Sequence, residues 1–374
     1  MRIFYLLSIL PFIGGFTIHS SVSPQPFTFT PLNIYNGTPG GRLNRDLRAT
    51  LPINELKGNP PSEGCPILNL HRCKNPSMYD KNDNIQMLSN PIQKTRGFLK
   101  LIRYKNILPT LLLTTTGGFL QTQSITQLLK SKSFLASSMI TVCIMASSMI
   151  LNDLFDIHVD KINNANRPLV TGEVHPQEAV TYAALLLLFA ECLTRYLPQQ
   201  MQMVANWAIV NIVLYTPLLK RIPLVKNLSC ATIVAFSLYF AGKSATSAVA
   251  TSPLLYVAAH TVFFGSLHNE LLLDIRDIEG DAKNHIRTVP GLFGKTAAWS
   301  LAAIGMVYNV VKISTALSVQ YSPAPFVVAM SPIFYHLYQI RRHNYSSAVI
   351  KKAVDFTNVP LLLSLLYFCK ISFS

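Results

Sequence analysis

Two short stretches of the chain concentrate acidic side chains at a repeated spacing. The first acidic window, Asn152–Asp160, has aspartates at 153, 156 and 160, and the second acidic window, Asp274–Asp281, has them at 274, 277 and 281. Residues three and four positions apart share one face of a helix, so each window directs three carboxylates the same way. Carboxylate oxygens are the ligands that Mg²⁺ prefers. The windows therefore predict a magnesium site with the ligands Asn152, Asp153, Asp156, Asp160, Asp274, Asp277 and Asp281.

Basic residues accompany the two windows. Arg167 and Arg287 follow them in sequence, and Lys220 and Lys226 stand at the end of an apolar segment between them. A diphosphate group needs its charge neutralised by metal ions and by cationic side chains together. We therefore expect these four residues to bind a diphosphate. The alternative is that they are ordinary anchors at a membrane surface, the interpretation that we give to Arg341 and Arg342, among others.

Three further polar residues are candidates for lining a pocket. Arg103 and Asn106 open the first apolar segment, and Tyr215 begins the stretch that leads to Lys220. Polar groups within apolar helices often mark a cavity. Glu270, four residues before the second window, either extends its acidic face or is solvated at a helix end. The expected chemistry needs no nucleophilic side chain, and we assign none.

The composition indicates an integral membrane protein that must hold these residues in a helical bundle. Half of the 374 residues are hydrophobic, 13% are charged and mean hydropathy is +0.32, whereas a soluble domain has about 25% charged residues. This apolarity excludes a disordered chain. The six cysteines are scattered and form no CxxC pair, which gives no support to a disulfide scaffold or a zinc site. The net charge of +15 has no basic face or recognition fold beside it, so no nucleic-acid partner is predicted.

Apolar segments recur from residue 98 onward and predict an all-α, polytopic membrane bundle of nine transmembrane helices over 98–374. A span needs about 20 residues. With nine spans, sixteen Lys and Arg lie on the side of the two acidic windows and six on the other, which places both windows on the cytosolic, stromal or matrix side. The predicted spans are about 98–121, 134–151, 178–197, 203–219, 228–248, 253–272, 296–317, 323–340 and 356–373.

The first 97 residues have a different character. Residues 1–20 have one arginine before an apolar run, which is typical of a signal-like targeting segment. Residues 21–97 are rich in Pro, Asn and Ser and poor in acidic residues, and they predict a disordered leader like a transit peptide. The two parts together resemble a two-step plastid presequence. We therefore expect a plastid membrane in preference to a mitochondrial or endoplasmic reticulum membrane.

The chain from about 98 to 374 resembles the UbiA superfamily of membrane prenyltransferases. The resemblance is carried by Asn152–Asp160, Asn166–Gly172, Tyr215–Lys220, Asp274–Asp281 and Arg287–Lys295. It implies a nine-helix fold in which Mg²⁺ and basic residues grip a prenyl diphosphate. The allylic C–O bond then ionises, and an electron-rich small-molecule acceptor attacks the allylic carbon.

The second window resembles the branch that contains homogentisate prenyltransferases, chlorophyll synthases and geranylgeranylglyceryl phosphate synthases. The acceptor is therefore expected to be an aromatic or quinone precursor, chlorophyllide or a glycerol phosphate compound, and none of the three is singled out. The alternative class is a membrane transporter or cation-binding protein without transferase activity, since intramembrane carboxylates also mark ion paths. The oligomeric state is not predicted.

Overall fold

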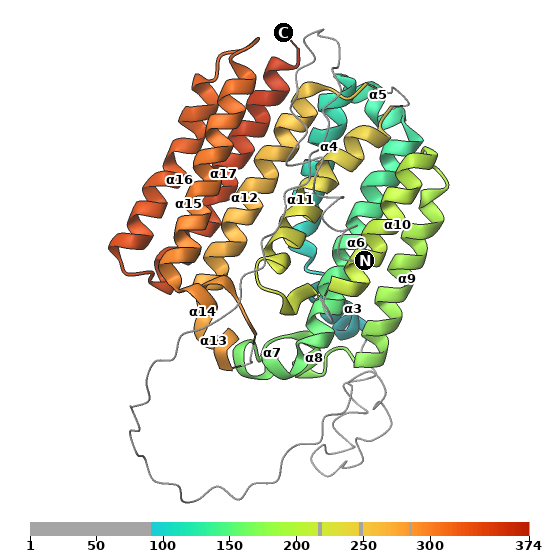
Figure 1. The fold of residues 1–374 in the computed structure, drawn as a ribbon. Helices are drawn as coiled ribbons and strands as arrows, with labels where there is room; N and C mark the ends of the chain where they lie inside the picture. Colours follow the sequence, from blue (N-terminus) through green and yellow to red (C-terminus); the bar gives the residue numbers. More distant parts are fainter. Residues whose placement is uncertain (1–90, 216–218, 247–249, 284–285, 374) are drawn as a thin grey trace, which may run out of the picture. The chain divides into compact units, whose positions relative to one another are not determined.

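The computed structural model describes residues 91–215, 219–246, 250–283 and 286–373, and within these ranges it contains helices and no strand. Figure 1 shows the described part as a bundle of long helices joined by short connections. All of these residues belong to one compact unit, 85–374. The signal-like segment and most of the predicted leader lie outside the described residues.

Nine helices of 16 to 25 residues run through the described part, one at each predicted span. Five of them, α6, α9, α11, α15 and α17, are long and apolar enough to cross a membrane. The helices α4 and α10 have 16 and 17 residues, shorter than the about 20 that a span requires, so nine crossings stay a prediction. The nine helices are α4 (Ile107–Thr122), α6 (Lys132–Phe155), α9 (Pro176–Thr194), α10 (Gln199–Tyr215), α11 (Val225–Ser244), α12 (Pro253–Arg276), α15 (Lys295–Leu317), α16 (Ala324–Arg342) and α17 (Ser347–Ile371).

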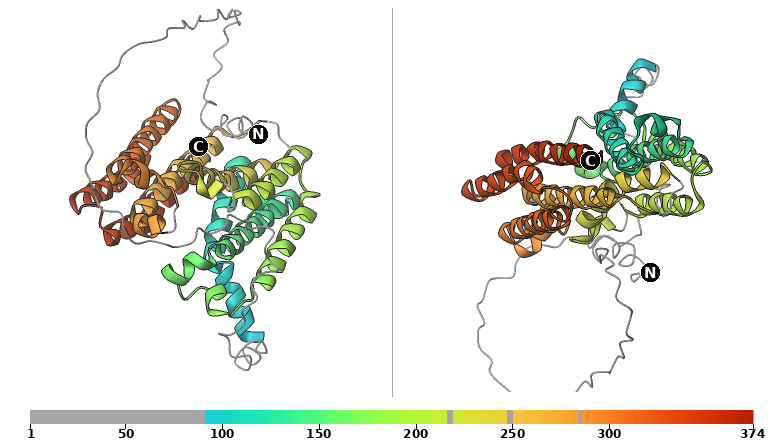
Figure 2. Two further views of the ribbon diagram at one scale, coloured as in Figure 1. Left: turned by 60° about the horizontal axis from the view of Figure 1, so that its bottom comes forward. Right: turned by 90° about the horizontal axis from the view of Figure 1, so that it is seen from above.

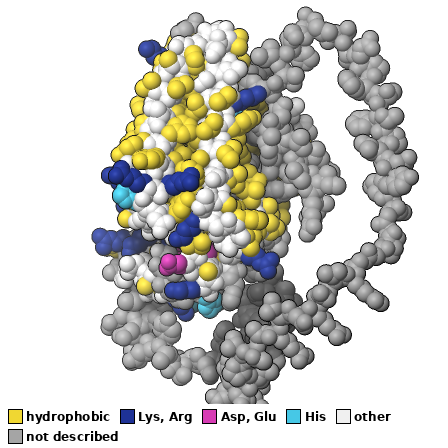
Figure 3. Space-filling view, turned by 60° about the vertical axis from the view of Figure 1, so that its left-hand side comes forward, with side chains coloured by type: hydrophobic (Ala, Val, Ile, Leu, Met, Phe, Trp, Pro, Cys, Tyr) yellow, Lys and Arg dark blue, Asp and Glu magenta, His cyan; other side chains and the backbone are white. Residues whose placement is uncertain are grey.

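The helix α12 joins the two parts of the bundle, because it contacts α4 and α11 on one side and α15 and α17 on the other. Figure 2 shows α15, α16 and α17 grouped apart from α6, α9 and α10. The outer faces carry exposed apolar side chains, such as Ile304, Val311 and Val328 on α15 and α16, as expected for helices surrounded by lipid. The broad apolar surface in Figure 3 has most of its Lys and Arg side chains toward the lower end.

The helices α4 and α11 approach closely at a glycine. A Cβ atom placed on Gly117 would lie 2.0 Å from the backbone oxygen of Leu238, so α11 cannot keep its position against any larger residue. Small residues permit such backbone contact between membrane helices, where tight packing drives association.

We expect Gly117→Ala to lower the thermal unfolding temperature of the detergent-purified protein by about 5 °C or more, because overpacking costs about 1–3 kcal/mol. The matched control is Gly305→Ala on α15, where the new Cβ would meet Phe264 at an ordinary 3.4 Å. Equal unfolding temperatures for the two variants would contradict the close approach.

The first predicted span is wrong in one respect, because the chain breaks at Arg103 instead of forming one helix over 98–121. A separate helix, α3 (Pro91–Leu101), is followed by the 3-10 turn η1 (Tyr104–Asn106) and then α4. Arg103 has φ 51° and ψ 59°, the left-handed conformation, which turns its guanidinium toward Asp153. Residues 91–97, the last part of the predicted leader, belong to α3, and the boundary between leader and membrane domain stays a prediction.

Both acidic windows cross the end of a long helix. The chain turns at Asp156 between α6 and α7 (Ile157–Asn163), and at Asp277 between α12 and α13 (Ile278–Lys283). The three aspartates of each window therefore do not lie on one continuous helix. Backbone bonds from the Asp160 amide to the Asp156 carbonyl and from the Asp281 amide to the Asp277 carbonyl still keep one helical turn after each break, at 2.7 and 2.9 Å. This turn keeps the last aspartate of each window close to the preceding two.

Candidate active site

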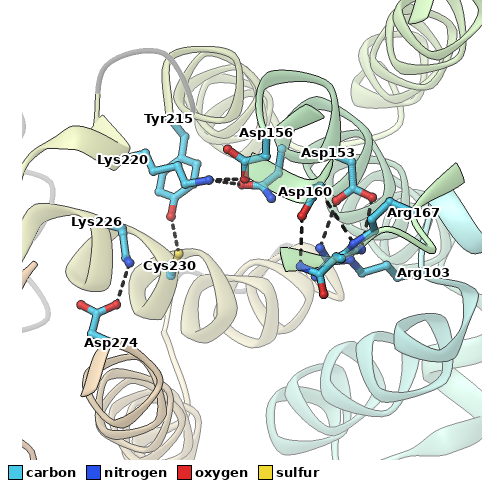
Figure 4. Close-up of polar contacts among 12 residues, drawn as sticks. Arg103, Asp153, Asp156, Asp160, Arg167, Tyr215, Lys220, Lys226, Cys230 and Asp274 are labelled. Atoms are coloured by element: carbon cyan, nitrogen blue, oxygen red, sulfur yellow. Dashed lines mark hydrogen bonds and ion pairs between the residues drawn. The ribbon is translucent and has the colours of Figure 1, made fainter. Parts of the chain in front are cut away.

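Asp153 is the buried centre of the first acidic window. Its side chain is 1% exposed and lies between two arginines, with Arg103 Nη2 donating to Oδ1 at 3.1 Å and Arg167 Nη1 donating to Oδ2 at 3.2 Å (Figure 4). Arg167 is the residue before the short helix α8 (Pro168–Thr171), and its Nε also lies 3.9 Å from Asp160. Asp160 accepts a further bond from Asn164 at 3.0 Å. This side of the site therefore holds two carboxylates and two guanidinium groups.

Lys220 lies between α10 and α11 in the chain and contacts the first window. It lies in the 3-10 turn η2 (Leu219–Arg221) and donates to Asn152 Oδ1 at 3.1 Å and to the Asp156 carboxylate. The charge of Lys220 also acts on Asp281 of the second window. Both windows therefore lie within the electrostatic reach of one ammonium group.

Lys226 and Asn227 hold the buried end of the second window. Both begin α11, and they donate to the two oxygens of Asp274 on α12, at 2.6 Å from Lys226 Nζ and 2.9 Å from Asn227 Nδ2. Asp274 is 3% exposed, so this pair of contacts neutralises a carboxylate that burial would otherwise penalise. The packing of α11 against α12 brings these three residues together.

The rest of the second window is less enclosed. Asp277 pairs with its neighbour Arg276 at 2.7 Å and its side chain is 49% exposed. Within the described residues, the Asp281 side chain forms no hydrogen bond or ion pair. Burial raises the pKa of the Asp281 carboxyl to about 6, assisted by the charge of Asp274 and opposed by that of Lys226. A cation beside Asp281 would stabilise the ionised carboxylate, which burial disfavours.

The predicted pocket and diphosphate residues separate into two groups. Arg103, Arg167, Lys220 and Lys226 all contact carboxylates of the windows. Tyr215 lies at the end of α10 and makes a 3.0 Å hydrogen bond with Cys230 between the two windows (Figure 4). Asn106 is exposed at the start of α4, and Arg287 is exposed between α13 and α14 (Val289–Phe293). Among the described residues neither is brought to the carboxylates.

Sequence reasoning missed four residues that the fold adds to the site. Asn227 and Arg276 are direct neighbours of residues already identified, and that adjacency could have drawn attention to them. Asn164 and Cys230 lie one helical turn after Asp160 and Lys226, so their spacing also carried a signal. The contacts that recruit them are Asn227 to Asp274, Arg276 to Asp277, Asn164 to Asp160 and Cys230 to Tyr215.

The oxygen groups suit a hard cation, although the aspartates are paired mainly with lysine and arginine. Among the described residues no three His, Cys, Asp or Glu form a metal-holding group. The buried Oδ1 of Asn227, beside Asp274, has no hydrogen-bond partner within the same residues. This orphaned acceptor and the uncompensated Asp281 carboxyl fit an oxygen-ligated cation such as Mg²⁺.

Comparison with known proteins places this arrangement in a family. The UbiA prenyltransferase family profile matches residues 110–359, which is more than half of the chain. The chain is 26% identical over 241 residues to a digeranylgeranylglyceryl phosphate synthase of Saccharolobus solfataricus, covering 64% of this chain and 80% of that protein. It is 30% identical over 197 residues to the synthase of the same name from Methanococcoides burtonii, covering 51% and 68%.

Solved structures agree on the fold. A UbiA homologue from Archaeoglobus fulgidus, solved with GPP and Mg²⁺ bound, has a TM-score of 0.56 at 20% identity, over 74% of this chain and 100% of its own. A structure described as a digeranylgeranylglyceryl phosphate synthase has a TM-score of 0.59 at 21% identity, over 75% and 98%. These likenesses confirm the predicted resemblance. The family match favours a transferase over the transporter alternative: the chain belongs to the UbiA prenyltransferase family and is an integral membrane prenyltransferase.

Proposed function

We propose that this protein transfers an isoprenoid chain from a prenyl diphosphate to the hydroxyl group of a glycerol phosphate compound. The observation that carries the proposal is the pairing of two acidic windows with Lys220 and Lys226 at one end of an apolar bundle. A diphosphate headgroup needs carboxylate-bound metal and cationic side chains, and an isoprenoid tail needs an apolar environment.

Both acidic windows contribute residues to the proposed donor site. Asn152, Asp156, Asp274, Asp277 and Asp281 supply oxygens for Mg²⁺, which, when bound, neutralises charge on the leaving diphosphate. The ammonium groups of Lys220 and Lys226, which pair with Asp156 and Asp274, would supply the positive charge for the diphosphate oxygens. Asp153 and Asp160 are occupied by arginines and contribute through them. The cations proposed for this role are Arg167, Lys220, Lys226 and the exposed Arg287.

The names of the relatives support the glycerol phosphate class among the three acceptors considered. Both synthases compared above act, by name, in forming digeranylgeranylglyceryl phosphate. An acceptor of this kind has a free hydroxyl as the attacking group and an anionic phosphate. Arg103, which is not among the cations proposed for the diphosphate and lies on the side away from Lys226, can accommodate this second anion.

The acceptor is tested with the full chain purified in detergent with Mg²⁺ and radiolabelled geranylgeranyl diphosphate. Geranylgeranylglyceryl phosphate, homogentisate and chlorophyllide are supplied one at a time, and the prenylated product is measured. We expect product with geranylgeranylglyceryl phosphate at a rate at least tenfold above the other two. Preferred prenylation of homogentisate or chlorophyllide would overturn the proposed acceptor.

We propose that all nine long helices cross the membrane, with both acidic windows on one side. Single cysteines replacing Ala165, after α7, and Lys283, at the end of α13, would report the side in sealed vesicles, in a background lacking the six native cysteines. We expect a membrane-impermeant maleimide to label both positions from the same side. Labelling of the two positions from opposite sides would contradict a shared site.

We also propose the organelle whose membrane holds the protein. The composition of residues 1–97 favours a plastid membrane. The archaeal relatives give this organelle no support, because they come from cells without organelles. Fusion of residues 1–97 to a fluorescent protein in a cell with plastids would test it.

A further inference from the structure

Three polar side chains lie one helical turn deeper in the bundle than the Lys226–Asp274 pair. On α11, Cys230 is four residues after Lys226, and on α12, Glu270 is four residues before Asp274. One turn of helix rises about 5.4 Å, so Cys230 and Glu270 form a second level below the first. Tyr215 reaches the same level from α10.

The three groups at this level are partly buried, and two of them contact each other. Tyr215 and Cys230 are joined by a 3.0 Å hydrogen bond. Glu270 is half-buried and lies in the fields of Lys226 and Asp274. An acidic group inside an apolar bundle is costly and usually has a function there. The donor site described above does not use Glu270.

Prenyl transfer to a hydroxyl group has a step that the donor site does not serve. The allylic C–O bond breaks and its electron pair leaves with the diphosphate, while an oxygen lone pair of the acceptor forms the new C–O bond. The hydroxyl proton must then go to a base. With the diphosphate held at the level of Lys220 and Lys226, the allylic carbon attached to it lies on the side of the apolar bundle, toward Glu270.

We propose that the Glu270 carboxylate, at the level of the hydrogen-bonded pair of Tyr215 and Cys230, is the catalytic base that accepts the proton released by the acceptor. The assignment rests on the proposed function, because it requires an acceptor that releases a proton, as a hydroxyl group does. An aromatic acceptor would release a ring proton to the same carboxylate.

The test uses Glu270→Gln, which is isosteric and cannot take the proton. The acceptor in the assay is the compound that the wild-type protein prenylates. The wild-type result therefore tests the proposed acceptor, and the Glu270→Gln result tests the proposed base separately. Two rates are measured on the Mg²⁺-loaded protein: product formation, and positional exchange of a bridging ¹⁸O label in the donor, which reports breakage of its C–O bond. The matched control is Glu191→Gln, an exposed glutamate at the far end of α9.

We expect product formation by Glu270→Gln to fall about a hundredfold or more, the usual contribution of a general base, while positional exchange stays within about threefold of wild type. Glu270→Asp should restore part of the product formation, and Glu191→Gln should leave both rates unchanged. A parallel fall of both rates in Glu270→Gln would assign Glu270 to donor binding or packing and overturn the proposal. Unchanged product formation would overturn it as well.

Discussion

Asp156→Asn and Asp274→Asn are expected to lower prenyl transfer about a thousandfold each. Each substitution keeps the shape of the side chain but removes a negative charge that a bound Mg²⁺ requires. A bound metal ion neutralises charge in the transition state and lowers its free energy by several kcal/mol. A loss of about 4 kcal/mol corresponds to a thousandfold lower rate. Asparagine can still accept a hydrogen bond from Lys220 or Lys226, so the local packing has a replacement partner.

The measurement is steady-state transfer of labelled prenyl chain at saturating Mg²⁺, together with thermal unfolding in detergent. Glu191→Gln, at the far end of α9, serves as the control, since this glutamate is exposed and lies outside both windows. Its activity should stay within about twofold of wild type. Wild-type turnover in both Asp156→Asn and Asp274→Asn would refute the proposed magnesium site.

The helical architecture was predictable because apolar segments of about 20 residues have few other ways to satisfy their backbone. Every predicted span has a helix at its position, from α4 to α17. The spacing of the aspartates likewise predicted which residues gather at one end of the bundle. Both predictions rest on local patterns, which the sequence displays directly.

Features that depend on tertiary contacts could not be predicted from local sequence patterns. The break at Arg103 arises from its reach to Asp153, fifty positions away, and no local pattern indicates a left-handed arginine. The turn at Asp156 similarly follows from where α7 packs. Asn106, a polar residue at the start of an apolar segment that was expected to line a pocket, lies exposed beside the break, so its role stays a prediction.

The partners of Lys220 could not be predicted from the sequence either. The contacts of Lys220 distinguish it from basic residues such as Arg342. The Lys220 side chain is 18% exposed and donates to Asp156 and Asn152. Arg342, at the end of α16, is exposed and far in sequence from either window. The two residues therefore test whether a basic side chain serves the diphosphate or only anchors a helix.

Lys220→Ala is expected to depress kcat by tens- to hundreds-fold and to raise the KM for prenyl diphosphate. Negative charge builds on the diphosphate as its C–O bond breaks, so an ammonium group beside it matters more in the transition state than in the bound donor. One charge-assisted contact of this kind contributes about 2–4 kcal/mol. Arg342→Ala should change either parameter by less than about twofold, because an anchor at the membrane surface is replaceable.

Steady-state kinetics with varied prenyl diphosphate separates these outcomes. Lys220→Arg keeps the charge but not the geometry of the ammonium group, and it should recover donor binding more than turnover. If Lys220→Ala raised KM alone, the lysine would bind the donor without assisting ionisation. Equal and small effects in Lys220→Ala and Arg342→Ala would make Lys220 a surface anchor, and the Asp156 carboxylate would then have its lysine only as a counter-ion.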